Sequence, residues 1–367
     1  MIEKLKNLDI FTPYIIAITI LVFLILGYIG SFNYRFDSPL SSETILIILY
    51  SVLVFSIGVF LIKKYIVFKK KSTSRFYNIQ NSINKLISEK LLVIIILIAC
   101  ILQIINLIQI GGIPLFSSEL KSNATTDIWR VSYLLFLVGI NFLIAKYYKN
   151  KYLILVLLGI GLFTLNGYRT SIMGILISLF INLYYIGKLN FKIITIFILG
   201  ILGLGLAIGF IASQSITGQI WLLNPLELVF YRAAFTLKVF ENIIPLAGTT
   251  GGHILGMIFS TGSPRTYIGE YVLNYHALIT STIFGPVYLD FGIIGLTIQM
   301  LFFGTFLKLV HIIQKNIKEL AIGIYSILVA HTLIWIETGP TDIMIWLLFL
   351  LGIVIIVLNT DNIKIKG

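Results

Sequence analysis

The sequence predicts an all-α, polytopic membrane protein, and hydropathy and charge content are the first indications of the class. Hydrophobic residues make up 58% of the chain, charged residues only 11%, and the mean hydropathy is +1.01. A soluble domain carries about a quarter charged residues. Apolar runs of about 17 or more residues recur along the chain, and each is long enough to cross ~30 Å of hydrocarbon as a helix. The runs are continuous rather than alternating, so helices and not barrel strands are expected.

About ten spans are expected, and one long external segment interrupts them. The spans run over 11–29, 43–62, 91–110, 129–145, 152–168, 170–187, 193–212, 279–307, 320–336 and 343–358. The first is too long for a removable signal peptide and lacks a small-residue cleavage site, so it is expected to remain as a span. Residues 1–367 are interpreted as a single transmembrane domain, with 213–278 inserted outside between the seventh and eighth spans. Because the other outer connections are short, function is expected in this long segment.

The positive charges divide unevenly between the two sides of these spans. With both termini placed in the cytoplasm, 20 of the 27 Lys and Arg residues fall inside and 7 outside, which is the positive-inside pattern of a cell-membrane protein. The stretch KKYIVFKKKSTSR at 63–75 is then a juxtamembrane cluster that faces anionic membrane lipids. This distribution accounts for the net charge of +12, and no nucleic-acid partner is expected.

The type of cation differs between the two sides as well. Nineteen of the 20 inner cations are lysines, whereas five of the seven outer ones are arginines. Topology requires only positive charge, but a planar guanidinium is favoured where phosphate or carboxylate is bound bidentately. An external site for a phosphorylated or acidic ligand is therefore expected, with interfacial snorkelling as the alternative for any single arginine. The outer arginines are Arg35, Arg130, Arg169, Arg232 and Arg265.

Arg169 stands in an almost unbroken apolar run, LFTLNGYRTSIMGILIS at 162–178. The short connection NGYRTS joins the fifth and sixth spans and holds Arg169 at the outer rim, in a position fixed by two helices. Thr170 and Ser171 open the sixth helix, whose N-terminal amides and dipole favour an anion at the same place. We therefore expect Arg169 to bind an anionic group.

The long external segment contains a predicted helix in NPLELVFYRAAFTLKVFENIIP at 224–245. Asn224 can cap it, Pro225 fits the first helical position, Glu227 stands at the capping-box position, and Pro245 ends it. Arg232 lies to one side of a narrow polar stripe, and such a helix is expected to lie on the membrane surface. The stripe consists of Glu227, Tyr231, Lys238 and Glu241.

Two further stretches of the external segment are distinctive. GTTGGHILG at 248–256 lacks the Lys-Ser/Thr of a nucleotide-binding loop and is interpreted as a flexible segment or lid. SPRTYIGEYVLNYH at 263–276 is the densest polar and aromatic cluster outside. Such a mixture suits a sugar site, in which aromatic faces stack on sugar rings and a carboxylate or imidazole handles a hydroxyl proton; the alternative is ordinary interfacial tyrosines. The cluster consists of Arg265, Tyr267, Glu270, Tyr271, Tyr275 and His276.

Four stretches resemble the O-antigen polymerase family. They are GGIPLFSS (111–118) followed by Arg130, NGYRTSIM (166–173), YR at 231–232, and GPVYLDFGIIG (285–295) with its flanking Ser281 and Thr282. These oligosaccharide repeat unit polymerases are similar to the O-antigen ligases and share their membrane glycosyltransferase fold. The likeness covers about 111–300.

The chain departs from the ligases at two places. Gly292 and Gly295 match the glycine pair that opens a late helix in the ligases, but Ser281 stands where the ligases carry a histidine, and the nearest imidazole is His276. Met173 stands where the ligases carry a leucine after their arginine. The differences put the proton acceptor in question and favour a polymerase over a ligase.

The resemblance implies transfer of a growing glycan from a polyprenyl diphosphate carrier to the next lipid-linked repeat unit, on the external face of the membrane. Donor and acceptor are then both polyprenyl-diphosphate-linked oligosaccharides, and a chain-length regulator protein is a further candidate partner. The diphosphate leaving group gains charge as the glycosidic bond breaks, so arginines around it would stabilise the transition state. The candidates for binding diphosphate and sugar are Arg169, Arg232, Arg265, Arg130, Tyr231, Tyr267 and Tyr288.

The acceptor hydroxyl must lose a proton as it attacks, and His276, Glu270 and Asp290 are the candidate catalytic residues. Asp290 lies in the outer half of a span, where a carboxylate is unfavourable unless paired. The sequence has no Asp-x-Asp, and its external histidines have no metal-ligand spacing, so catalysis without metal or other cofactor is expected. Glu337 and Asp342, on the last outer turn, either bind sugar hydroxyls or only mark topology.

Three other functions remain open at this level. A ligase would transfer finished glycan to another acceptor, and a non-catalytic scaffold would tolerate lysine in place of Arg169 and Arg265. A lipid-linked oligosaccharide flippase would carry charged residues or broken helices near mid-membrane in two repeated halves, and the sequence has neither a repeat nor a mid-span charge pair. Sugar identity, linkage, carrier type and oligomeric state are not encoded in any recognisable motif.

Overall fold

The structure is a computed structural model that describes residues 9–68, 86–117, 119–120, 124–189, 223–260 and 262–365, with a few positions between 194 and 207. Regular structure in these residues is helical, apart from a two-stranded antiparallel ribbon of β1 (Ile66–Phe68) and β2 (Ile363–Ile365). The all-α class expected from the sequence is thus confirmed.

The apolar helices coincide with the expected membrane spans. Five are long and apolar enough to cross a membrane: α3 (Ser42–Tyr65), α5 (Glu89–Ile110), α7 (Asp127–Tyr147), α14 (Gly285–Ile317) and α15 (Leu320–Thr338). Four shorter apolar helices are α2 (Tyr14–Gly30), α8 (Leu153–Thr164, preceded by the 3₁₀ turn η2, Asn150–Tyr152), α9 (Arg169–Tyr185) and α16 (Ile343–Val357). Most of the expected seventh span, 193–212, lies outside the described residues, and residues 69–75 of the basic cluster lie wholly outside them.

Local sequence explains where several of these helices begin and end. Ser41, Ser88 and Thr126 cap α3, α5 and α7, since each hydroxyl accepts a hydrogen bond from an amide of the first turn. Gly111 ends α5 in the left-handed region, with φ of 82°. A short 3₁₀ turn, η1 (Pro114–Phe116), follows α5. Another, η4 (Thr360–Asn362), follows α16 near the C-terminus.

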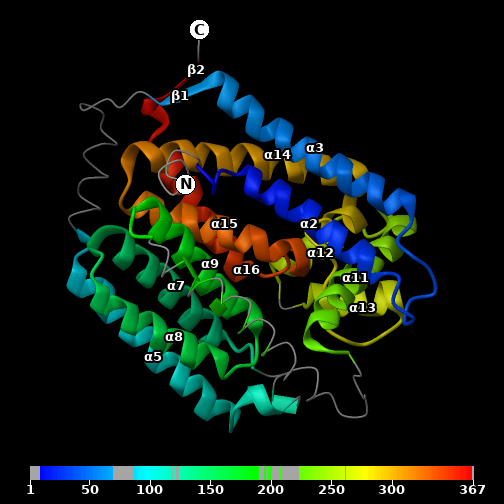
Figure 1. The fold of residues 1–367 in the computed structure, drawn as a ribbon, viewed down its shortest axis with the longest axis horizontal. Helices are drawn as coiled ribbons and strands as arrows, with labels where there is room; N and C mark the ends of the chain where they lie inside the picture. The colour runs from blue at the N-terminus through cyan, green and yellow to red at the C-terminus, as the bar shows by residue number, and fades with distance from the viewer. Residues whose placement is uncertain are drawn as a thin grey trace.

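Helix α15 lies at the centre of the bundle. It contacts α2, α7, α9, α14 and α16. In its most apolar 18-residue stretch 83% of the residues are buried, whereas the corresponding share is 33% in α3 and in α5. Figure 1 shows α3 running beside α14 along one side of the molecule and α5 on the opposite side. The faces of α3 and α5 that are not buried are apolar, as expected for helices in contact with lipid.

Helices α11 (Pro225–Ile243), α12 (His253–Ile258) and α13 (Pro264–Leu273) gather at one end of the molecule, at the right of Figure 1, while the β1–β2 ribbon lies at the other. The predicted start of α11 is confirmed, because Asn224 and Glu227 form a capping box and Pro225 takes the first position. The helix ends at Ile243, and η3 (Ile244–Leu246) contains the predicted Pro245.

Helix α11 packs tightly along the C-terminal part of α2. A Cβ atom at Gly30 would come within 2.1 Å of the Phe230 carbonyl oxygen, and one at Gly27 within 2.4 Å of Leu237 Cδ1. Glycine at these two positions therefore lets the helices approach closely, as small residues do in other membrane helix pairs.

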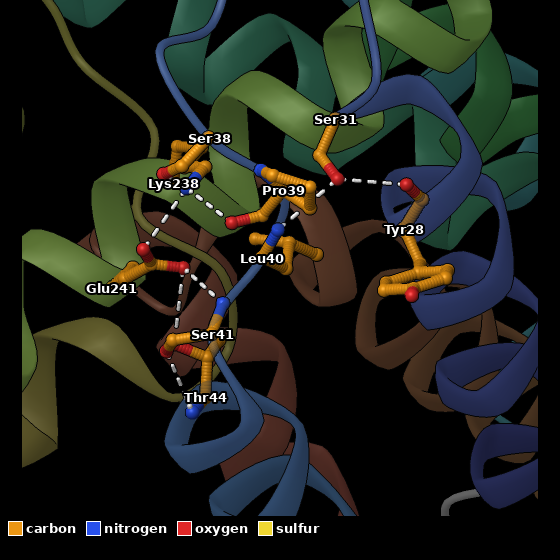
Figure 2. A network of polar contacts seen from close by, with 9 residues as sticks. All are labelled: Tyr28, Ser31, Ser38, Pro39, Leu40, Ser41, Thr44, Lys238 and Glu241. Atoms are coloured by element: carbon orange, nitrogen blue, oxygen red, sulfur yellow. Dashed lines mark hydrogen bonds and ion pairs between the residues drawn. The ribbon is translucent and has the colours of Figure 1, made fainter.

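Two residues of the predicted polar stripe on α11 do not face solvent. Figure 2 shows Lys238 and Glu241 bound to the connection between α2 and α3. Lys238 Nζ donates to the Pro39 carbonyl (2.9 Å) and to Glu241 (2.9 Å), and Glu241 Oε2 accepts from the Ser41 amide (3.0 Å) and the Thr44 hydroxyl (3.3 Å). This network fixes α11, and with it Arg232, against the first two spans.

Candidate functional site

Two arginines from separate helices meet at one carboxylate. Arg169 is the first residue of α9, Arg232 lies in α11, and Glu337 lies in the last turn of α15. Arg169 Nη2 and Arg232 Nε both donate to Glu337 Oε1, the latter over 2.9 Å. The three side chains are 27% to 35% exposed. The site is therefore half-buried, where an ion pair is screened less than at a fully exposed surface.

Arg265, from α13, lies close enough to this pair for its charge to interact with Glu337 and Arg232. Its Nε donates to Thr341 Oγ1 over 3.0 Å. Burial lowers the pKa of Arg265 from the ordinary arginine value, and the carboxylate of Asp342 opposes this shift, so the guanidinium stays charged at neutral pH. We call Arg169, Arg232 and Arg265 the arginine cluster.

The loop before α14 closes one side of the arginine cluster. Arg232 Nη2 donates to Thr280 Oγ1 (3.0 Å), and the Thr282 amide donates to the Glu337 carbonyl (3.3 Å). Thr282 has a φ of 65°, a conformation that β-branched residues rarely adopt. Gly339 has a φ of 75°, and a Cβ there would come within 2.7 Å of the Thr282 carbonyl oxygen. Backbone strain of this kind is often found at functional sites.

The arginine cluster has unused hydrogen-bonding capacity. Across the described part of the chain, the terminal nitrogens of Arg265 and the Oε2 atom of Glu337 have no hydrogen-bond partner. Three guanidinium groups face the carboxylates of Glu337 and Asp342, and Asp342 also caps α16 by accepting from the Met344 amide (2.9 Å). Positive charge and free donors thus remain, which is the chemistry that binds a phosphate group.

His276 and Glu270 form a separate pair near the end of α13. His276 Nδ1 is in hydrogen-bond contact with Glu270 Oε1, and the two side chains are 81% and 50% exposed. Tyr267, on the same helix, stacks on Tyr271 with ring centroids 5.4 Å apart, and His253 meets Tyr267 edge-on at 4.9 Å. The segment singled out in the sequence therefore presents an imidazole, a carboxylate and aromatic faces at the surface.

Asp290 has a structural place rather than that of a base. It is 2% exposed, and its carboxylate accepts hydrogen bonds from the Thr250 hydroxyl (2.6 Å) and from the Ile254 (3.0 Å) and Leu255 (2.8 Å) amides. These amides belong to the first turn of α12. Asp290 therefore anchors the glycine-rich segment 248–256, which was interpreted from the sequence as a flexible segment or lid. A buried carboxylate with three donors is poorly placed to take a proton from a substrate hydroxyl.

Three other predicted ligand-binding residues have partners outside the arginine cluster. Tyr288 is buried against Phe240, with ring centroids 5.6 Å apart. Tyr231 stacks on Phe36 at 5.2 Å, on the side of α11 that faces the α2–α3 connection. Arg130 pairs with Asp127 one turn earlier on α7, over 3.0 Å.

The sequence did not identify Glu337 as the residue that the arginines share, because it left open whether Glu337 binds sugar hydroxyls or only marks topology. A signal was present, because a carboxylate in the last turn of an apolar span is unfavourable without a cation. Thr280 and Thr341, which each accept from an arginine, carried no such signal.

No metal site is defined in the described ranges. They contain no group of three or more His, Cys, Asp or Glu side chains that could hold a metal ion. The binding capacity of this end of the molecule comes from guanidinium groups.

Fold and site together define a class: a polytopic helical membrane protein with a half-buried, arginine-rich anion site at one end of its bundle. Residues 9–349 match a family model whose description reads "Putative O-antigen polymerase". The chain belongs to this O-antigen polymerase family, and the match extends well beyond the 111–300 in which the resemblance was recognised. Membership supports a polymerase role in the membrane.

Two relatives from Methanocaldococcus jannaschii are similar to the chain, and both are described as uncharacterized proteins. MJ0420 is 31% identical over 229 residues, which cover 62% of this chain and 54% of the relative. MJ0419 is 30% identical over 260 residues, which cover 68% of this chain and 71% of the relative. The chain thus spans about half the length of the first relative. No solved structure matches the chain.

Proposed function

We propose that this protein is a membrane glycosyltransferase that polymerises lipid-diphosphate-linked oligosaccharide repeat units on the external face of the cell membrane. One observation carries the proposal: Arg169, Arg232 and Arg265, from three different helices, converge around Glu337. Snorkelling explains a single arginine at a membrane interface, but it does not explain two that share one carboxylate while a third lies close enough for its charge to interact with it.

The arginine cluster suits a diphosphate leaving group. When the bond between the donor sugar and the diphosphate breaks, negative charge grows on the diphosphate, and guanidinium donors already in place stabilise the transition state more than the bound donor. Arg265 has free terminal nitrogens, and Arg169 and Arg232 become available if Glu337 gives way to the more highly charged diphosphate.

The surface of α13 suits the sugars of the repeat units. Tyr267 and Tyr271 present stacked rings, and His276 with Glu270 supplies hydrogen-bonding groups for hydroxyls. Tyr267, Glu270 and Tyr271 lie on the same short helix as Arg265, and His276 follows it, so a lipid-linked oligosaccharide could place its diphosphate on the arginine cluster while its sugars extend along this surface.

The distribution of cations supports an external site. Arg169 begins α9 and Glu337 ends α15, whereas Lys63, Lys146 and Lys315 lie in the last turns of α3, α7 and α14. The C-terminal ends of α9 and α14 meet, since Tyr185 and Lys315 both bind Asp9. The lysines therefore lie at the end opposite the arginine cluster, and the positive-inside rule assigns that end to the cytoplasm.

The test is polymerisation by the purified protein in liposomes. Lipid-linked repeat units are extracted from cells of the source organism that lack this protein, added to the liposomes, and the products are separated on a gel. A ladder with the spacing of one repeat unit is expected. A single added product would indicate a ligase instead, and unchanged substrate from well-folded protein would contradict glycan transfer and favour a transporter.

A further inference from the structure

The two oxygens of the Glu337 carboxylate have different surroundings. Oε1 accepts from both Arg169 and Arg232, whereas Oε2 has no hydrogen-bond partner within the described residues and belongs to a side chain that is 27% exposed. One oxygen thus orients the carboxylate, and the other is free to accept a hydrogen bond from a ligand.

The backbone around Glu337 is held in place. The Thr282 amide donates to the Glu337 carbonyl, and the Gly339 amide donates to the Trp335 carbonyl over 2.9 Å. Movement of the carboxylate is thereby limited to rotation about side-chain bonds. If an anion replaces it on the arginines, the carboxylate stays beside that anion.

We propose that Glu337 is the proton acceptor of the transfer reaction, and that binding of the donor diphosphate to Arg169 and Arg232 activates it. This inference rests on the proposed function. A carboxylate paired with two guanidinium groups is a weak proton acceptor, because the positive charges stabilise its ionised form. The diphosphate competes for the same donors, and a carboxylate freed from them accepts a proton more readily.

The step balances without a further reactant. Glu337 Oε2 takes the proton of the acceptor hydroxyl while the hydroxyl oxygen forms a bond to the anomeric carbon of the donor glycan. The bond between that carbon and the diphosphate oxygen breaks, and its electron pair leaves with the diphosphate. The proton then passes from Glu337 to the departing diphosphate or to water, which restores the carboxylate and its pairing with the arginines.

The other candidate bases are less well placed. Both oxygens of Asp290 accept hydrogen bonds beneath α12, and in the described part of the molecule no hydrogen bond or ion pair joins the His276–Glu270 pair to the arginine cluster. The charged groups that face Glu337 are Arg169 from α9, Arg232 from α11, Arg265 from α13 and, across the turn before α16, Asp342. Tyr168 lies beside Arg265, and its phenol is neutral near pH 7.

The decisive variant is Glu337→Gln, which keeps the size of the side chain and an oxygen for the arginines but accepts no proton. Its kcat is expected to fall by about 10²- to 10⁴-fold, the usual range for removal of a general base. Binding of a polyprenyl diphosphate without sugar, used as the probe, is expected to stay as tight as in the wild type or become tighter. Glu337→Asp, one methylene shorter, is expected to keep intermediate activity.

A control variant and a pH profile make the result specific. Asp37→Asn, an exposed carboxylate in the α2–α3 connection, is expected to leave kcat unchanged. The acid limb of the wild-type kcat profile against pH is expected to disappear in Glu337→Gln. Near-normal kcat with that limb intact, or loss of probe binding together with loss of activity, would overturn the inference and leave Glu337 as a counter-ion. Absence of a ladder with the wild type would instead refute the proposed function itself.

Discussion

The two ends of the bundle each hold a carboxylate surrounded by cations, but they use it differently. At the arginine end, Glu337 Oε1 serves two arginines and Oε2 is free within the described structure. At the other end, both oxygens of Asp9 are occupied: Oδ1 accepts from the Tyr185 hydroxyl (2.8 Å), and Oδ2 contacts His311 Nε2 (2.8 Å) and Lys315 Nζ. We call Asp9, His311 and Lys315 the lysine-end cluster.

The difference separates a structural ion cluster from a candidate binding site. In the lysine-end cluster the hydrogen bonds join the segment before α2 to α9 and α14, and Tyr325 adds a bond from α15 to the Phe11 carbonyl (2.6 Å). Every oxygen of Asp9 is used to hold helices together. The arginine cluster keeps free donors and a free acceptor, which hold no helices together and are available to a ligand.

The distinction between the two ends would fail most clearly if an arginine of the arginine cluster could be replaced by lysine without loss of activity. Arg232→Lys is expected to lower kcat/KM by about 10²- to 10³-fold, because lysine cannot donate simultaneously to the Glu337 carboxylate and the Thr280 hydroxyl in the same plane. Initial rates of repeat-unit transfer measure the effect. The converse exchange in the lysine-end cluster, Lys315→Arg, is expected to leave those rates within about twofold of the wild type. Equal effects at the two ends would remove the distinction.

The next largest effect is expected where α2 supports α11. Gly30→Ala places a methyl group within 2.1 Å of the Phe230 carbonyl oxygen, so α11 must shift and carry Arg232 with it. We expect a loss of about 2–3 kcal/mol in stability and a lower transfer rate, measured by thermal unfolding in detergent and by initial rates. Gly161→Ala in α8 is the matched control, because no atom lies within 4 Å of its new methyl group. A tolerated Gly30→Ala would show that the close α2–α11 contact does not position the arginine cluster.

A change in the lysine-end cluster is expected to alter stability and not catalysis. Asp9→Asn should reduce stability at neutral pH by about 1–2 kcal/mol, since hydrogen bonds between charged groups are lost, with kcat unchanged. Burial raises the pKa of Asp9, but hydrogen bonds from His311, Lys315 and Tyr185 outweigh it and hold the pKa well below its ordinary value. A depressed pKa means that the stabilisation is present above about pH 4, the unfolded value, and is lost as the pH falls further.

Thermal unfolding of the wild type and of Asp9→Asn between pH 3 and pH 8 measures this contribution. The difference between the two proteins is expected to be largest at neutral pH and to shrink toward the acid end. A difference that grew on acidification would contradict the assigned role of Asp9.

The smallest effect is expected from Asp290→Asn. The side-chain oxygen of the asparagine can still accept hydrogen bonds, but its NH₂ group then faces a backbone N–H that the second carboxylate oxygen of Asp290 accepted from. About 1 kcal/mol of local stability is therefore lost where the glycine-rich segment attaches. Transfer should persist at a rate within about tenfold of the wild type. A loss as large as that expected for Glu337→Gln would return Asp290 to the list of candidate bases.

Short-range features of the fold were readable in the sequence. Hydropathy located the apolar helices, since a span depends only on its own composition, and Asn224, Pro225 and Glu227 located the start of α11, since a capping box involves neighbours three residues apart. The contacts of Lys238 and Glu241 could not be predicted, because their partners lie on the α2–α3 connection about 200 residues away in sequence. The role of Asp290 was hidden for the same reason, since the amides that it binds belong to α12.

By itself, the sequence determined that this chain is a bundle of apolar helices with lysines gathered at one end and arginines at the other. Helix formation and membrane insertion depend on local composition, so a linear reading suffices for them. Only the tertiary structure decided that Arg169 and Arg232 meet at Glu337, from which they are 168 and 105 residues distant in sequence. Pairing over such separations depends on how α9, α11 and α15 pack around one another, and no local pattern of residues records that packing.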